Sequence, residues 1–126
     1  MNRVAPAEGG TAADIHRHFR GLIVSGVLGG GERLPTVRQV AGDLGVAPGT
    51  AAKAFRQLEQ EGLVVTRAGA GTRVSPEAAL LPYGVVDRIR ALVNESRRQG
   101  ATIDDVLAAL RASWDSEPQL STGAWT

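Results

Sequence analysis

A tight turn between two helical segments, followed by a glycine-centred hairpin, constrains the fold of this chain more than any other feature. Gly45 directly follows residues 37–44, whose apolar side chains recur at helical spacing, and it is typical of the glycine that ends a helix. Pro48 stands where the first turn of the next helix should begin. The sequence therefore predicts two helices joined by the short connection Gly45-Val46-Ala47.

A third helix precedes this pair. It is expected to begin at Thr11 and to end near Gly26, and Thr36 is a good N-cap for the helix over residues 37–44. The helix that starts at Pro48 should run to about Glu61. The residues expected to face inward are Ile15, Phe19, Leu22, Ile23, Val37, Val40, Ala41, Leu44, Ala51, Ala54, Phe55 and Leu58.

A β-hairpin is predicted next, because residues 63–67 and 72–74 favour strands and flank the turn Ala68-Gly69-Ala70-Gly71. Three helices followed by such a hairpin are typical of a winged helix-turn-helix module, here over residues 11–76. In that module the helix after the turn is narrow enough to enter the major groove of DNA, and the hairpin lies over the flanking backbone or minor groove. The fold class expected is α+β, mainly helical.

After the winged module, the sequence predicts two further helices over residues 81–114. A flexible arm at residues 1–10 precedes the module, and a flexible tail at residues 115–126 follows the last helix. Two helices alone form a thin core, so they either pack back on the winged module or meet their copies in a second subunit. A homodimer is favoured, because two-fold pairing is the commonest oligomer and presents two recognition helices to a palindrome. The expected interface residues are Val85, Val86, Ile89, Leu92, Val93, Ile103, Val106, Leu107, Leu110 and Trp114.

Several function classes are excluded by residue content. The chain has no cysteine, and so no disulfide framework, thiolate zinc site or cysteine nucleophile. His16 and His18 are two residues apart on a helix, so they point to different faces, cannot share a metal and are expected at the surface. No set of nucleophile, base and orienting group is present, and we expect no enzyme activity, cofactor or metal. Apolar runs are too short to span a membrane and no export signal is visible, which favours a cytoplasmic protein.

Charge is divided unevenly along the chain. Residues 1–74 carry nine basic and six acidic residues, whereas residues 75–126 carry five basic and seven acidic ones. The first part is therefore net positive and the second net negative. This mild asymmetry is compatible with a polyanionic partner for the winged module but does not require one.

Specific residues strengthen the prediction. The run Leu34-Pro35-Thr36-Val37-Arg38, inside residues 26–41, resembles the signature of GntR-family transcriptional regulators. Residues 44–46, 50–58, 61–64 and 69–74 resemble the same family in the same order, so the likeness covers about residues 11–74. The short two-helix remainder is similar to the YtrA-type branch, whose C-terminal region is described as a dimerisation element without a large ligand-binding domain.

The resemblance implies roles for individual residues. Arg38 matches a DNA-contacting arginine, Thr36 replaces a serine that caps a helix and contacts phosphate, and Thr50 matches a recognition-helix threonine. Ala47 and Pro48 replace the Ser/Thr and Arg of many members, so a base-reading arginine is missing. Because Ala47 is a poor N-cap, we expect the amides of Gly49 and Thr50 to be free to bind a DNA phosphate. The candidate DNA-binding residues are Thr36, Arg38, Pro48, Gly49, Thr50, Lys53, Arg67, Gly69, Gly71 and Arg73.

The function predicted is therefore a regulator, expected to be a repressor, that binds a palindromic operator in double-stranded DNA as a homodimer. Two alternatives stay open: a winged-helix protein-interaction module that binds no DNA, and a regulator that lacks a larger C-terminal domain. The part after the wing is too short to enclose a pocket for a drug-sized effector. A small effector cavity between subunits would be lined by Tyr83, Arg88, Arg97 and Trp114.

Overall fold

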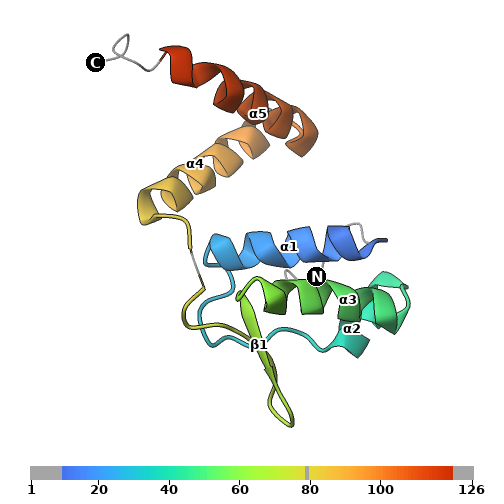
Figure 1. The fold of residues 1–126 in the computed structure, drawn as a ribbon. Coiled ribbons are helices and arrows are strands. Elements are labelled where there is room, and N and C mark those ends of the chain that lie inside the picture. The colour runs from blue at the N-terminus through green and yellow to red at the C-terminus, as the bar shows by residue number, and fades with distance from the viewer. Residues whose placement is uncertain (1–9, 79, 121–126) are drawn as a thin grey trace. The chain divides into compact units, whose positions relative to one another are not determined.

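The computed structural model describes residues 10–78 and 80–120 of the chain, and the side chains of these up to residue 116 (Figure 1). They fall into two compact units that divide between Pro82 and Tyr83. The first unit contains helices α1 (Ala12–Val24), α2 (Val37–Leu44) and α3 (Pro48–Gln60), followed by strands β1 (Val64–Arg67) and β2 (Gly71–Val74). The second unit contains α4 (Tyr83–Gln99) and α5 (Ile103–Leu120).

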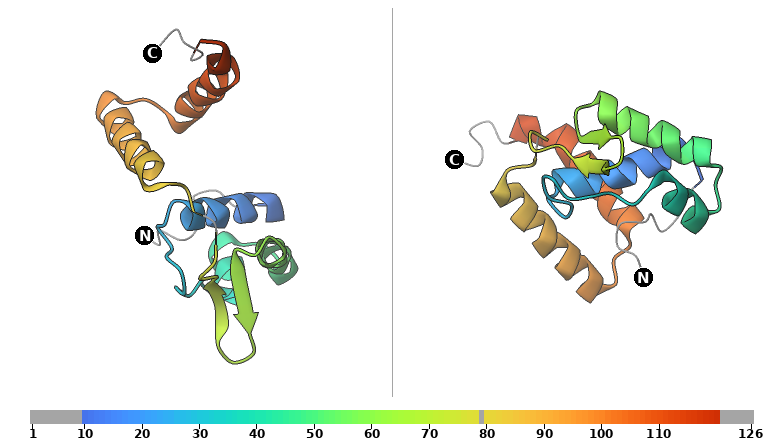
Figure 2. Two further views of the ribbon diagram at one scale, coloured as in Figure 1. Left: turned by 60° about the vertical axis from the view of Figure 1, so that its left-hand side comes forward. Right: turned by 90° about the horizontal axis from the view of Figure 1, so that it is seen from below.

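The core of the first unit lies where α3 packs against α1 and α2, with the hairpin extending beyond the helices (Figures 1 and 2). Phe19 of α1 and Phe55 of α3 meet edge to face, with ring centroids 5.5 Å apart. Most residues expected to face inward are buried, whereas Leu22, Val37 and Leu44 are only partly buried and pack against the margin of the core. The buried core residues are Ile15, Phe19, Ile23, Leu28, Leu34, Val40, Ala41, Ala51, Ala54, Phe55, Leu58, Leu63, Val64 and Val74.

Local hydrogen bonds explain where α2 begins and ends. The Thr36 hydroxyl accepts from the Gln39 amide at 3.0 Å, and the Gln39 side chain accepts from the Thr36 amide at 2.8 Å. This reciprocal capping box satisfies two amides that the first turn of a helix leaves without a partner. Gly45 ends α2 in the left-handed conformation, with φ of 67°, which most other residues adopt at a cost. The predicted bounds of this helix are confirmed.

The hairpin is antiparallel, and Val64 pairs with Val74 while Arg67 pairs with Gly71. Residues 31–34 lie along the other edge of β2. The Leu34 amide donates to the Thr72 carbonyl at 2.8 Å, the Val74 amide donates to the Glu32 carbonyl at 2.9 Å, and Arg33 is bridged to Arg73. The β1–β2 hairpin, the wing of the module, is therefore widened by a third extended segment, residues 31–34, which the sequence did not predict.

The histidine prediction needs a correction. His16 and His18 are half-buried rather than at the surface. Nε2 of His16 lies 2.7 Å from Oε1 of Glu61, the residue at the C-terminal end of α3, and the His18 ring stands edge-on to Phe19. This polar contact joins α1 to α3 and depends on a residue distant in sequence, so helical periodicity alone could not show it.

The second unit consists of α4 and α5, which meet at the turn around Gly100 and then diverge (Figure 1). The α5 helix continues to Leu120, so the flexible tail expected from residue 115 begins too early in that prediction. The rest of the expected tail, residues 121–126, and residues 1–9 of the expected arm lie outside the described residues.

The described residues contain neither a membrane-spanning helix nor a metal-binding cluster. None of the described helices combines the length and the apolar character needed to cross a bilayer. Within the same residues, histidine and carboxylate side chains do not gather in groups of three or more that would hold a metal ion.

Candidate nucleic-acid interface

The start of α2 places Thr36 and Arg38 at the surface, as the sequence predicted. The Thr36 hydroxyl acts as the N-cap, so its oxygen accepts from the Gln39 amide while its proton stays available to donate. Gln39 was missed as a contributor, although the spacing Thr-x-x-Gln is the sequence signature of a capping box. Thr36 and Gln39 border a shallow hollow, which is also lined by Arg33, Leu34 and Pro35.

The start of α3 differs from this arrangement. Ala47 occupies the N-cap with no side-chain hydrogen bond, and Pro48 is in the first helical turn. The Thr50 amide donates to the Ala47 carbonyl at 3.0 Å, so the expectation that it is free is wrong, because the first turn closes more tightly than an α-helix. Among the described residues the Gly49 amide has no hydrogen-bond partner, and Gly49 is exposed. One backbone donor of the expected pair therefore faces solvent.

The rest of α3 has one buried and one open face. Ala51, Ala54, Phe55 and Leu58 are buried in the core. On the open side Lys53 is exposed and Thr50 is half-buried. The structure thus places the predicted recognition residues outside the core, on the helix that directly follows the tight turn.

The hairpin brings the remaining candidates together. Arg67 and Arg73 are exposed on β1 and β2, and Arg73 donates through Nη1 to the Gly31 carbonyl at 3.2 Å. Gly69 and Gly71 have φ of 78° and 74°. Their positive φ angles account for both glycines as turn residues, whatever else they contact.

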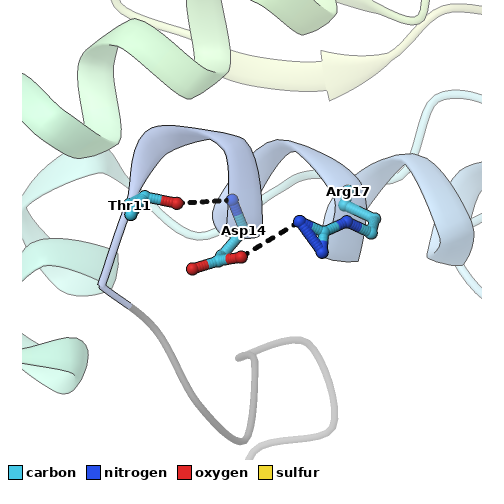
Figure 3. A network of polar contacts seen from close by, with 3 residues as sticks. All are labelled: Thr11, Asp14 and Arg17. Carbon is cyan, nitrogen blue, oxygen red and sulfur yellow. Dashed lines mark hydrogen bonds and ion pairs between the residues drawn. The ribbon is translucent and has the colours of Figure 1, made fainter. Parts of the chain in front are cut away.

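Two arginines outside the candidate set are paired with carboxylates, whereas the candidate cations have no such partner among the described residues. Arg17 donates to Asp14 at 3.0 Å, beside the Thr11 cap of α1 (Figure 3), and Arg98 is paired with Glu95 in α4. Over the described residues, neither Arg38 nor Lys53 forms an ion pair, and the same holds for the wing arginines. These charges are thus available to an external anion.

The second unit holds the candidate interface for a partner. Apart from Val86, which is buried, and Val106, which is half-buried, the expected interface side chains are exposed, and Trp114 is 77% exposed. A groove of about 630 Å³ lies between α4 and α5. Of the four side chains expected to line an effector cavity, only Arg97 borders this groove. Its lining is Ile89, Leu92, Val93, Ser96, Arg97, Ala101, Ile103, Val106, Leu107 and Leu110.

Comparison with known families decides the nature of the first unit. The model of the gntR family of bacterial regulatory proteins matches residues 11–74, which hold α1 to α3 and the hairpin. The chain belongs to the GntR family. Residues 11–74 therefore form the domain that defines this family of bacterial regulatory proteins, and the winged helix fold is confirmed. This family consists of regulators rather than enzymes, in agreement with the sequence-based expectation.

Individual relatives support a likeness to short GntR regulators. The chain is 53% identical over 61 residues to the HTH-type transcriptional regulator Rv1152 of Mycobacterium tuberculosis, covering 45% of this chain and 50% of the relative. It is 36% identical over 64 residues to the HTH-type transcriptional repressor YtrA of Bacillus subtilis, covering 51% and 49%. The match thus spans about half the length of these relatives.

A solved structure extends the likeness. YtrA from Sulfolobus acidocaldarius, a GntR-family transcription factor, aligns with a TM-score of 0.52 and 25% identity over 77% of this chain and 99% of that one. Together with the Bacillus relative, it confirms the YtrA-type likeness expected from the sequence. The contacts of individual side chains with DNA stay predictions.

Proposed function

We propose that this protein is a sequence-specific repressor that binds a palindromic operator as a homodimer. The observation that carries the proposal is that the two helices on either side of the turn of a GntR domain carry exposed cations without an ion pair to any described residue, Arg38 on α2 and Lys53 on α3, and a free backbone amide at Gly49. Phosphate is the anion that suits such donors, and an α-helix fits the major groove. The repressor role is supported by the Bacillus relative, which is named a transcriptional repressor.

Within this proposal the two kinds of contact fall on different groups. The Gly49 amide, at the positive end of the α3 dipole, binds a phosphate and fixes the position of the helix. Arg38, Thr50 and Lys53 contact base edges, because they project from the two helices on either side of the turn. Phosphate contacts set affinity for any duplex, whereas base contacts distinguish one sequence from another.

The homodimer is supported by the exposed apolar side chains of the second unit. Ile89, Leu92 and Val93 of α4 and Leu107 and Leu110 of α5 line one groove and remain more than a third exposed. A contiguous apolar surface of this kind is typical of an association site. A second copy is the partner that also supplies a second recognition helix, with half-sites about one helical turn of DNA apart.

Replacing Arg38 by alanine tests base reading. Binding is measured by fluorescence anisotropy with a duplex from the region upstream of the protein's own gene and with a scrambled duplex, over a range of salt concentrations. If Arg38 reads a guanine with two hydrogen bonds, the R38A variant loses about 1–3 kcal/mol on the operator and much less on the scrambled duplex. Equal loss on both would indicate a phosphate contact instead.

The matched control is Arg17→Ala, which removes the same charge from a side chain already paired with Asp14. It should leave the preference for the operator unchanged. Failure of the unaltered protein to bind either duplex would favour the alternative, a winged-helix module that binds another protein.

A further inference from the structure

The wing has two faces, and the strand register determines which residues lie on each. Residues directly opposite one another in an antiparallel pair share a face, and side chains alternate along each strand. Leu34, Val64 and Val74 are buried on the core face. Arg73 is opposite both Val65 and Arg33, so these side chains lie on the outer face, where Val65 is exposed.

The same register adds Arg67 to the outer face, because it is two residues from Val65 and opposite Gly71. Three arginines, Arg33, Arg67 and Arg73, thus share one face of a small sheet, and all three are exposed. Like charges on opposing positions destabilise a sheet. Among the described residues none of the three has an acidic partner, so the chain itself does not compensate this repulsion.

Gly71 gives Arg33 its position. A β-carbon built on Gly71 would lie 2.9 Å from both Nε and Nη2 of Arg33, closer than a real side chain allows. The guanidinium group therefore occupies the space that any other residue at position 71 would fill. It lies close to the turn of the hairpin, although Arg33 itself lies ahead of α2, and a β-carbon at position 71 would displace it.

We propose that Arg33 binds a DNA phosphate from the outer face of the wing, and that Gly71 leaves the space in which its guanidinium group lies. The inference rests on DNA binding by this domain, as proposed above. Arginine suits this task because its planar fork stays charged and matches the oxygens of a phosphate. A phosphate on this face also compensates the opposing charges of Arg33 and Arg73.

The test compares salt dependence of binding for Arg33→Ala, Arg33→Lys and unaltered protein, on the upstream and the scrambled duplex. Loss of one phosphate contact should weaken binding to both duplexes by roughly tenfold and reduce the slope of log affinity against log salt by about one. The R33K variant, which keeps the charge, should retain the slope. The R17A variant again serves as the control with an unchanged slope.

A second pair of variants tests whether a side chain at position 71 displaces the guanidinium group of Arg33. Gly69→Ala and Gly71→Ala both place alanine at a positive φ, but a β-carbon at Gly69 meets no atom within 4 Å. Both variants should therefore lose stability, whereas only G71A should also show the reduced salt slope. In the R33A background G71A should reduce the slope no further.

The outcomes separate the two proposals. If the unaltered protein binds DNA but R33A keeps the full salt slope, this inference is overturned while the proposed function stands. A lower thermal midpoint of R33A with an unchanged slope would likewise overturn it, since Arg33 would then only support the wing. If no duplex is bound by the unaltered protein, the proposed function itself fails.

Discussion

A single alanine at the start of α3 determines which backbone donors of that helix face solvent. Ala47 cannot accept a hydrogen bond through its side chain, and Pro48 has no amide to offer. The Gly49 amide is therefore left free in the described structure. A serine or aspartate cap would stabilise the helix by accepting from the amide of Gly49 or of Thr50, and in the first case it would occupy the donor that we assign to phosphate.

Replacing Ala47 by serine should separate stability from binding. The new hydroxyl would accept from an amide of the first turn and raise the free energy of unfolding by about 1 kcal/mol. If the hydroxyl accepts from the Gly49 amide, it competes with the DNA phosphate and affinity for duplex DNA should fall. If it accepts from the third helical residue, Thr50, as the cap Thr36 does from Gln39, affinity should stay unchanged. Chemical denaturation and anisotropy titrations measure the two effects.

The control is Ala47→Val, which adds a side chain of similar size with no acceptor. It should give no gain in stability from capping. Amide hydrogen exchange identifies which amide the new hydroxyl engages. An A47S variant with a protected Gly49 amide that binds DNA as tightly as the unaltered protein would contradict a phosphate contact at Gly49.

At the scale of elements, the turn after β2 couples a buried hydroxyl to an exposed carboxylate. Oγ of Ser75 donates to Oε2 of Glu77 at 2.7 Å. This hydrogen bond, followed by one from the backbone amide of Glu77, lowers the pKa of that carboxyl below its ordinary value of 4.5. A lowered pKa in the folded state stabilises the fold above the pKa of the unfolded chain, and this contribution is lost as pH falls through the folded pKa.

The Ser75→Ala variant should therefore raise the pKa of Glu77. The S75A variant should be less stable than the unaltered protein at neutral pH, because it lacks this hydrogen bond. The difference in stability should shrink in acid as the carboxyl of Glu77 protonates. Carbon-detected NMR titration follows the carboxyl, and denaturation at neutral and acidic pH follows stability. Glu95 is the internal control, because the hydrogen bonds from Gln99 and Arg98 that lower its pKa lie in α4. Unchanged titration of Glu77 in S75A would contradict this account.

Among the elements, those with locally determined ends were predicted from the sequence, whereas pairing between distant segments was not. Residues 37–44 were predicted as a helix with correct ends, since the cap at Thr36 and the glycine at position 45 act locally. The third segment of the wing was missed, because residues 31–34 pair with β2 across about forty positions of sequence. The position of Arg33 over Gly71 follows from that pairing and was missed with it.

The recognition site was predicted to a similar extent. Exposure of Arg38 and Lys53 followed from helical periodicity, and the absence of a side-chain cap at Ala47 followed from residue type. The engaged amide of Thr50 could not be predicted, because the choice between a tight and a regular first turn depends on backbone geometry that residue type does not fix. Sequence therefore predicted which of the candidate residues are exposed but not which of their donors are free.

For the whole molecule, the open question is what covers the apolar side of the second unit. Leu107 is about half exposed in α5 and borders the groove, whereas Ala112 is exposed on the opposite side of the same helix. If a second copy covers the groove, glutamate at position 107 would bury a charge in the interface, and the dimer should dissociate. Glutamate at position 112 adds the same charge outside it and should leave the dimer intact.

Sedimentation velocity at micromolar concentration distinguishes the two variants. The L107E variant should sediment as a monomer with the helix content of the unaltered protein, and the A112E variant as a dimer. Because one operator half-site would then be bound without its partner, L107E should also lose much of its affinity for the full palindrome while keeping that for a single half-site. A monomeric unaltered protein would contradict the homodimer, and a dimeric L107E would move the interface away from this groove.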